Sequence, residues 1–107
     1  MAQTFMVQLP EQTESWVAQE AERLDQSETT LVETLAEEGA RMWQFPGIAF
    51  RGAAQNRRAW VIGAGMDAWE IIEAYQALGL PERLYAEIGI TEQDLHLALA
   101  YYAKYPN

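Results

Sequence analysis

Residues 4–9 alternate between an apolar set of side chains and a mixed set, and this short pattern constrains the fold more than any other feature of the chain. The apolar set is Phe5, Val7 and Leu9, and the opposite set is Thr4, Met6 and Gln8. A period of two predicts a half-buried β-strand, which Pro10 ends. No second strand is predicted in residues 1–46, yet a strand needs a partner for its backbone hydrogen bonds. The simplest partner is the same strand of a second copy, so we expect a homodimer built on a two-stranded antiparallel ribbon.

Two amphipathic helices are predicted after this strand. Apolar positions recur at helical spacing from Glu11 to Leu24, and Ser27 is a suitable N-cap for a second helix that runs to about Met42. Over about 40 residues this order resembles the ribbon-helix-helix family of DNA-binding regulators. The resemblance implies that outward ribbon residues enter the DNA major groove and that the start of the second helix holds a phosphate. The DNA-binding residues implied in this way are Thr4, Met6, Gln8, Ser27 and Thr29.

The charge of the first half opposes DNA binding. The chain carries a net charge of −9. Residues 1–46 hold nine acidic side chains against Arg23 and Arg41, a net charge of −7. Affinity for nucleic acid comes mainly from neutralised phosphates, so this charge suits a basic protein partner better. Two interpretations therefore stay open: the ribbon binds operator DNA, or it is only the seam of the dimer.

Residues 45–107 predict a β-hairpin followed by three helices. The strands are expected at 48–51 and 58–62, and the helices are expected to begin at Asp67, Pro81 and Thr91. The side chains expected to face inward include Ile71, Ile72, Leu84, Ile88, Leu95, Ala98, Leu99 and Tyr102. The predicted fold class is mainly α with short β, in two domains. They are a ribbon-helix-helix-like dimerisation segment at 1–44 and a hairpin with three helices at 45–107.

Four stretches of the second half are distinctive: FPGIAFRG at 45–52, RRAWVIG at 57–63, DAWEII at 67–72 and LALAYYA at 97–103. Together they resemble an antitoxin-like bacterial family of unknown function, number 433, over about 60 residues. The resemblance implies a small winged-helix-like unit that neutralises a PIN-like nuclease toxin, with repression of the shared operon by dimeric DNA binding. The implied partners are the cognate toxin protein and operator DNA.

Arginines and tryptophans of the second half could meet a partner. Arg51, Arg57 and Arg58 form a local group of positive charge that can bind phosphates or a partner's carboxylates. They could equally balance acidic helices of the same chain or of its dimer mate. Trp60 and Trp69 have apolar neighbours, which favours the core over an exposed interface anchor.

Several function classes lack support in the sequence. The chain has no cysteine and one histidine, His96, which we expect on the surface of a helix. We therefore expect no catalytic residues, no cofactor and no metal site. No signal-peptide pattern and no membrane-spanning apolar run are found, so a cytoplasmic location is expected. The sequence predicts an antitoxin-type regulator, and the alternative is a dimeric protein-binding adaptor that does not bind nucleic acid.

Overall fold

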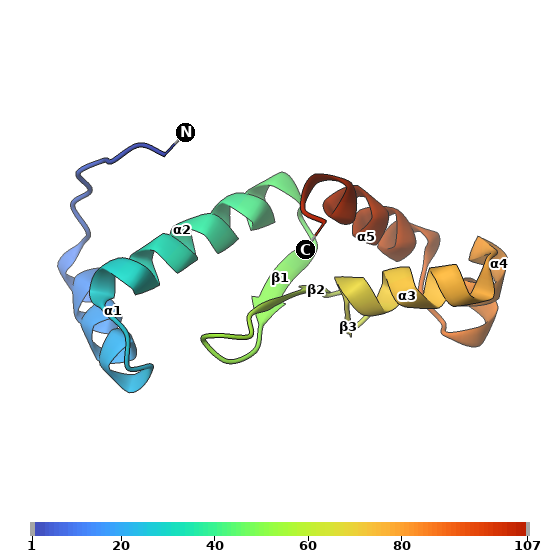
Figure 1. The fold of residues 1–107 in the computed structure, drawn as a ribbon, viewed down its shortest axis with the longest axis horizontal. Coiled ribbons are helices and arrows are strands. Elements are labelled where there is room, and N and C mark those ends of the chain that lie inside the picture. Colours follow the sequence, from blue (N-terminus) through green and yellow to red (C-terminus); the bar gives the residue numbers. More distant parts are fainter. Residues whose placement is uncertain (1, 107) are drawn as a thin grey trace. The chain divides into compact units, whose positions relative to one another are not determined.

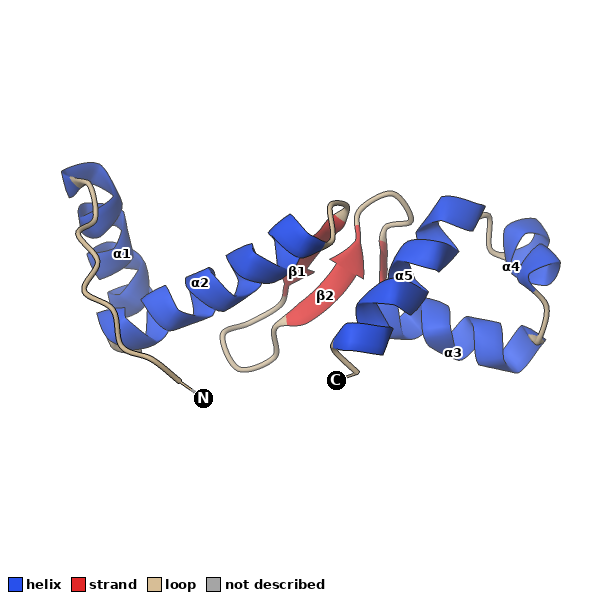
Figure 2. Cartoon of the chain, turned by 90° about the horizontal axis from the view of Figure 1, so that it is seen from above, coloured by secondary structure: helices blue, strands red, loops and turns tan. Residues whose placement is uncertain are grey.

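The computed structural model describes residues 2–106 and is mainly helical, with one small antiparallel sheet (Figures 1 and 2). The chain divides into two compact units, residues 1–37 and 38–107, called here the N-terminal unit and the C-terminal unit. The expected fold class, mainly α with short β, is confirmed at this level. No helix within residues 2–106 is both long and apolar enough to cross a membrane.

The N-terminal unit contains helix α1 (Glu11–Arg23) and the first turns of α2 (Glu28–Gln44). Both helices begin where the sequence predicts. Ser27 Oγ accepts a hydrogen bond from the Thr30 backbone nitrogen at 3.0 Å, which confirms the expected cap of α2. The core of this unit is small, and its buried residues are Val17, Ala21 and Leu31.

Residues 2–10 belong to no helix or strand, so the strand expected at 4–9 does not form within the described chain. A ladder needs a second strand, and the described part of this unit offers none. The side chains of Phe5 and Val7, expected on a buried face, are 75% and 72% exposed.

The C-terminal unit begins with the last turns of α2 and a three-stranded antiparallel sheet in the order β1-β2-β3. The strands are β1 (Ile48–Arg51), β2 (Arg58–Val61) and β3 (Met66–Asp67). Ile48 pairs with Val61 and Arg51 pairs with Arg58 across β1 and β2, as the predicted hairpin requires. Strand β3 was not expected, because two residues are too few to show a periodicity.

Three helices follow the sheet: α3 (Ala68–Leu78), α4 (Pro81–Glu87) and α5 (Glu92–Lys104). Gly79 ends α3 in the left-handed region, at φ +80°, where a residue with a Cβ would be strained. The Thr91 side chain accepts from the Asp94 nitrogen at 3.1 Å, and the Asp94 carboxylate accepts from the Thr91 nitrogen at 3.1 Å. This confirms the capping box predicted at the start of α5.

Strands and helices of the C-terminal unit share one core. Its buried residues are Ile48, Val61, Ala68, Ile71, Leu84, Ile90, Leu95, Ala98 and Tyr101. Most inward-facing positions predicted on the three helices lie in or against this core. The exceptions are Ile88 and Leu99, which are more than a third exposed, and Trp69, which is 45% exposed instead of buried. Tyr101 was not expected in the core, yet it is 2% exposed.

The division between the units falls within α2, earlier than the boundary predicted after residue 44. The reason is that the last turns of α2 bond to residues of α5 and beyond. Arg41 Nη1 donates to Tyr101 Oη at 3.0 Å, and Tyr105 Oη donates to Gln44 Oε1 at 3.1 Å. The apolar periodicity of α2 does not reveal that its first turns and its last turns belong to different units.

Candidate functional site

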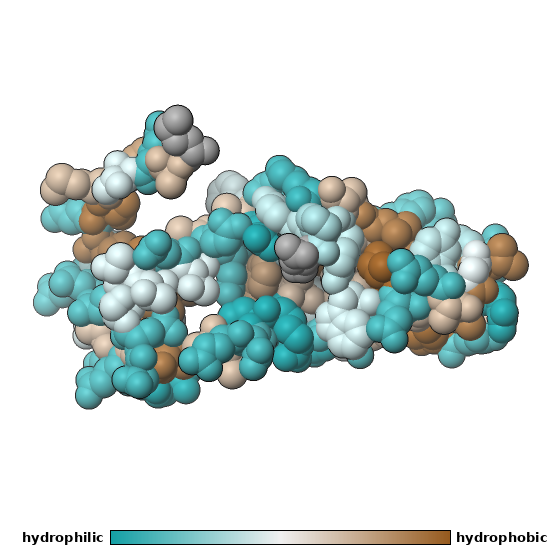
Figure 3. All heavy atoms as spheres, viewed as in Figure 1, coloured by the Kyte–Doolittle hydropathy of each residue, from teal (hydrophilic) through white to brown (hydrophobic). Residues whose placement is uncertain are grey.

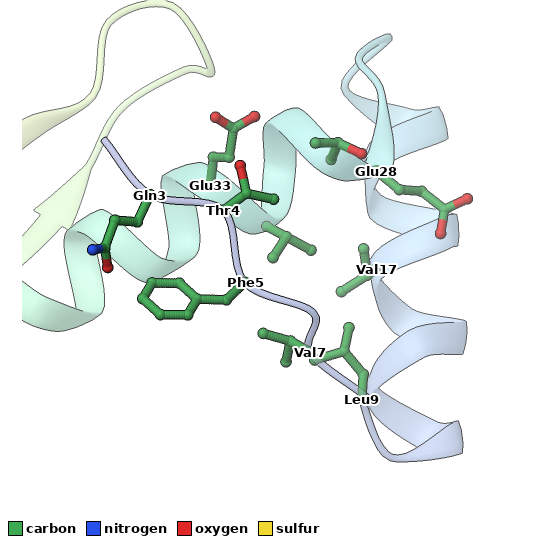
Figure 4. Close-up of a pocket in the computed structure, with 10 residues that line it drawn as sticks. Gln3, Thr4, Phe5, Val7, Leu9, Val17, Glu28 and Glu33 are labelled. Carbon is green, nitrogen blue, oxygen red and sulfur yellow. The ribbon is translucent and has the colours of Figure 1, made fainter. Parts of the chain in front are cut away.

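A hollow of about 510 Å³ lies in the N-terminal unit, between residues 3–9 and the facing parts of α1 and α2 (Figure 4). Its apolar lining consists of Phe5, Val7, Leu9, Val17 and Val32. Its polar lining consists of Gln3, Thr4, Glu28, Thr29 and Glu33. In Figure 4, Val7, Leu9 and Val17 gather on one side of the hollow. The three residues predicted to form the buried face of the strand therefore do share one surface.

Two further apolar side chains of this unit are also open to solvent. Trp16 on α1 is 49% exposed, and Leu35 on α2 is 40% exposed, although the sequence pattern places both on inner helix faces. Figure 3 shows hydrophobic atoms of the N-terminal segment open to solvent. The apolar face of this unit thus extends beyond what its own chain covers.

The DNA-binding residues predicted from the ribbon-helix-helix resemblance do not form one cluster. Met6 and Gln8 are exposed and lie outside the lining of the hollow. Thr4 and Thr29 line it together with the carboxylate-bearing Glu28. Ser27 lies at the start of α2, and its hydroxyl donates to Thr30 Oγ1 at 2.8 Å as part of the cap. An acidic side chain therefore lies between the two residues that the resemblance places beside a phosphate.

The predicted arginines of the C-terminal unit converge on carboxylates of the same unit. Arg51 Nε donates to Asp67 Oδ1 at 2.8 Å, and Arg58 Nε donates to Asp67 Oδ2 at 2.6 Å. Trp69 Nε1 donates to Asp67 Oδ2 at 3.1 Å. We call Arg51, Arg58, Asp67 and Trp69 the Asp67 cluster. The sequence left open whether these arginines bind a partner or balance acids of their own chain. The structure supplies an acid of the same chain, Asp67, for both of them.

Asp67 is 3% exposed, so its charge must be compensated within the protein. Burial by itself would raise the pKa of the Asp67 carboxyl. Hydrogen bonds from Arg58, Arg51 and Trp69 outweigh burial and lower the pKa below its ordinary value of 3.8. The carboxylate therefore stays charged and holds both arginines, which the register places directly opposite each other on β1 and β2.

Arg57 is fully engaged with another acid. Its Nε and Nη2 donate to the two carboxylate oxygens of Glu38 at 2.8 and 2.7 Å, a bidentate pair. Its Nη1 also donates to the Gly52 carbonyl oxygen at 3.0 Å. This arginine therefore links the β1–β2 turn to the second half of α2.

Some residues of this region were missed by the sequence interpretation. Asp67 was expected only as the start of a helix, although it also joins two arginines and a tryptophan. The signal was available in the hairpin: a register that places Arg51 opposite Arg58 needs a nearby acid, because like charges directly opposite repel. Trp60 also has a specific place, since the Arg51 guanidinium carbon lies 4.6 Å from its ring centroid.

Neither unit gathers the groups of a metal centre in its described residues. No three His, Asp or Glu side chains within residues 2–106 come together in a way that could hold a metal ion. The His96 side chain is 67% exposed, and its Nε2 lies 3.9 Å from a Glu92 carboxylate oxygen. This position agrees with the surface location expected for His96.

Comparison of the chain with protein-family models, with curated proteins and with solved structures found no match.

Proposed function

We propose that the protein is a dimeric, protein-binding regulator of the antitoxin type. One observation carries this proposal: the apolar face of the N-terminal unit is left open by its own chain, with Phe5 and Val7 more than 70% exposed beside a hollow of about 510 Å³. Burial of such a face is the main driving force of association. The occupant that fits best is a second copy of the same segment.

The backbone of the segment supports this choice of occupant. Residues 2–9 lie in no ladder, and their alternating pattern would place Phe5, Val7 and Leu9 on one face of a strand. Two such segments paired antiparallel would satisfy each other's backbone groups and cover both hollows by one two-fold operation. A ribbon-helix-helix arrangement of this kind would use α1 and α2 of both copies as its core.

The toxin as partner and the winged-helix-like character of the C-terminal unit come from the sequence resemblance to family 433. A hairpin followed by three helices is compatible with such a unit. In this proposal, the N-terminal unit makes the dimer and the C-terminal unit meets the toxin, a PIN-like nuclease. Repression of the shared operon would use the outward ribbon residues Thr4, Met6 and Gln8.

A second candidate, a dimeric adaptor that does not bind nucleic acid, is favoured by charge. Glu28 and Glu33 line the hollow beside Thr29, where the resemblance places a phosphate. The basic residues Arg51, Arg57 and Arg58 bond to carboxylates of their own unit. Both candidates share the dimer, and they differ only in whether DNA is a ligand.

Two adjacent substitutions test the dimer. Val7→Asp places a charge on the face that the second copy would bury, and Gln8→Asp places the same charge on the opposite face. Light scattering during gel filtration should give a dimer mass for the wild-type chain and for Q8D. The dimer of V7D should be weaker by at least about 100-fold, because each copy buries an unpaired carboxylate. A monomeric wild-type chain, or equal masses for V7D and Q8D, would refute the proposal.

Two further measurements separate the candidates. A gel shift with the DNA upstream of the gene, at low and moderate salt, should show a specific band for an operator-binding antitoxin. Gln8→Ala should weaken that band without changing the dimer, and the absence of any specific band leaves the adaptor. For the antitoxin role, expression of the neighbouring gene should arrest growth, and co-expression of this protein should restore it.

A further inference from the structure

The C-terminal unit contains a pocket of about 170 Å³ that is lined from α2, β1, β2, the start of α3 and the end of α5. Three cationic side chains line it: Arg41, Arg57 and Arg58. Three aromatic side chains with polar groups line it as well: Trp69, Tyr101 and Tyr102. In a chain with a net charge of −9, three of the seven basic residues border this one small pocket.

Arg58 is held in place and still has donors to offer. Its Nε is bound to Asp67 at 2.6 Å, while its Nη1 and Nη2 have no hydrogen-bond partner among residues 2–106. Its side chain is 44% exposed, so an incoming group can reach the two Nη nitrogens. A guanidinium fixed at Nε by a buried carboxylate presents its outer edge without further loss of side-chain entropy.

Arg58 shares its acid with a second arginine. Asp67 carries one negative charge and bonds to both Arg51 and Arg58. Glu70, whose carboxylate oxygen lies 3.9 Å from Arg51 Nη2, supplies a second negative charge. The two arginines and the two acids therefore balance in charge, and what Arg58 offers to a ligand is the pair of Nη donors rather than a surplus of positive charge.

Tyr102 adds a neutral donor to the same pocket. Burial, together with the nearby Tyr101 and Asp67, raises the pKa of the Tyr102 hydroxyl, so the group stays protonated at neutral pH. The hydroxyl has no hydrogen-bond partner within the described chain. A planar acceptor in the pocket could thus receive donors from two different elements, β2 and α5.

We infer that this pocket receives one carboxylate side chain, a glutamate or aspartate, from a protein partner of the chain. Arg58 Nη1 and Nη2 grip the two carboxylate oxygens, and Tyr102 Oη donates to one of them. The exposed ring of Trp69 forms one wall and packs on the methylene groups of the incoming side chain. The inference rests on the proposed role as a protein-binding regulator and names the chemistry of the partner's surface.

A carboxylate suits the pocket better than a phosphate of a nucleic acid. A nucleic acid brings a dense line of negative charges, which the remaining acidic surface repels. A carboxylate in a protein is a single charge that can have neutral or basic neighbours. The pocket also has room for one small planar group rather than for a strand of backbone.

The test uses two isosteric probes, N-acetyl-glutamate amide and N-acetyl-glutamine amide, added to the full chain. Two-dimensional ¹H–¹⁵N spectra follow the Trp69 indole and the Arg58 Nε, both of which are bonded to Asp67. The glutamate probe should shift both signals saturably with a dissociation constant of about a few millimolar, as expected for a ligand of this size. The glutamine probe should leave them unchanged. Absence of saturable binding of the glutamate probe overturns the inference.

Variants locate the binding within the pocket. Arg58→Gln should weaken the glutamate probe by about tenfold or more, because a charge-assisted bidentate pair is lost. Tyr102→Phe leaves the Asp67 cluster intact and should weaken binding by about threefold, so the inference stays testable if R58Q does not fold. Arg83→Gln removes an arginine whose Nη2 bonds to Glu87 on α4, and it should bind as the wild type does. Unchanged binding in both R58Q and Y102F overturns the inference.

A third arm uses inorganic phosphate. Tighter binding of phosphate than of the glutamate probe, on the same two signals, overturns the assignment to a carboxylate. None of these measurements depends on dimerisation, on DNA or on a toxin. A failure of this pocket and a failure of the proposed function are therefore recognised separately.

Discussion

The two units of this chain differ in the size of the core that each one buries. The C-terminal unit buries nine core residues drawn from strands, helices and a loop, and four of them, Val61, Ile71, Leu84 and Leu95, are less than 2% exposed. The N-terminal unit buries three, Val17, Ala21 and Leu31, of which one is an alanine. Fewer than 40 residues form that unit, a size at which a core rarely stabilises itself.

The two units also differ in whether their buried polar groups have hydrogen-bond partners. The buried carboxylate of the C-terminal unit, Asp67, accepts three hydrogen bonds. In the N-terminal unit, Gln26 Oε1 is buried and has no hydrogen-bond partner among the described residues, which costs about 1–3 kcal/mol. The difference teaches that the C-terminal unit meets its own needs for burial and hydrogen bonding, whereas the N-terminal unit leaves some of them unmet, as the proposed dimer requires.

The largest expected effect is on the complete unit. Leu84 is fully buried, so Leu84→Ala should lower the free energy of unfolding by about 3–4 kcal/mol through lost transfer energy and a cavity. Urea denaturation followed by circular dichroism measures this loss. Leu99→Ala on α5, where the leucine is 37% exposed, is the control and should cost less than about 1 kcal/mol. Equal costs for the two variants would mean that the core is not packed as described.

The next largest effect concerns the Asp67 cluster. Asp67→Asn keeps the size of the side chain but removes the charge that holds Arg51 and Arg58 opposite each other. We expect a loss of about 2 kcal/mol in the free energy of unfolding, below the range for fully buried pairs, since both arginines are more than a third exposed. Glu87→Gln, which breaks the exposed Arg83–Glu87 pair, should change it by less than about 0.5 kcal/mol. A D67N loss no larger than that of E87Q would argue against the cluster as a structural hub.

Local structure was predictable from the sequence, because its signals act over a few residues. Ser27 caps α2, Gly79 ends α3, and Thr91 with Asp94 forms the capping box of α5, as the residue types indicate. The hairpin from β1 to β2 was also predicted, from strands expected at 48–51 and 58–62, and the structure adds its register. In each case the residue that sets the structure is close in sequence to the residue it binds.

Long-range contacts were not predictable in this way. Arg41 bonds to Tyr101, and Arg57 bonds to Glu38. The sequence spacing of these residues does not indicate either pair. Trp69 is 45% exposed although its sequence neighbours are apolar, and its bond to Asp67 could not be read from that local pattern either. For residues 4–9, the alternation predicts a strand that the single chain does not form, and in the proposed dimer its ladder would come from the second copy.

A pH titration sharpens the role of Asp67. Its pKa is lowered in the folded protein, so its contribution to stability is present above the unfolded value of about 3.8 and is lost as the pH falls through the folded value. The urea midpoint of the wild-type chain should therefore drop between pH 5 and pH 3 by more than that of D67N. The difference should stay smaller than the cost of D67N itself, since a protonated carboxyl still accepts hydrogen bonds. Parallel curves for the two proteins would contradict the lowered pKa.

The smallest expected effect is the response of the proposed dimer to salt. Residues 1–37 hold eight acidic side chains against Arg23, a net charge of −7, and dimerisation brings two such units together. Raising the salt concentration from about 0.05 to 0.5 M should screen this repulsion and lower the dimer dissociation constant by about three- to tenfold. Sedimentation equilibrium at several salt concentrations measures the change.

A matched pair of variants tests whether the salt effect arises at the proposed dimer interface. Glu33 lines the hollow, so Glu33→Gln should tighten the dimer at low salt and flatten its salt dependence. Glu22 is exposed on α1 and lies outside the lining, so Glu22→Gln should have the smaller effect on both quantities. If higher salt weakens the dimer instead, the copies meet through ion pairs, and the apolar face of the N-terminal unit is not what holds them together.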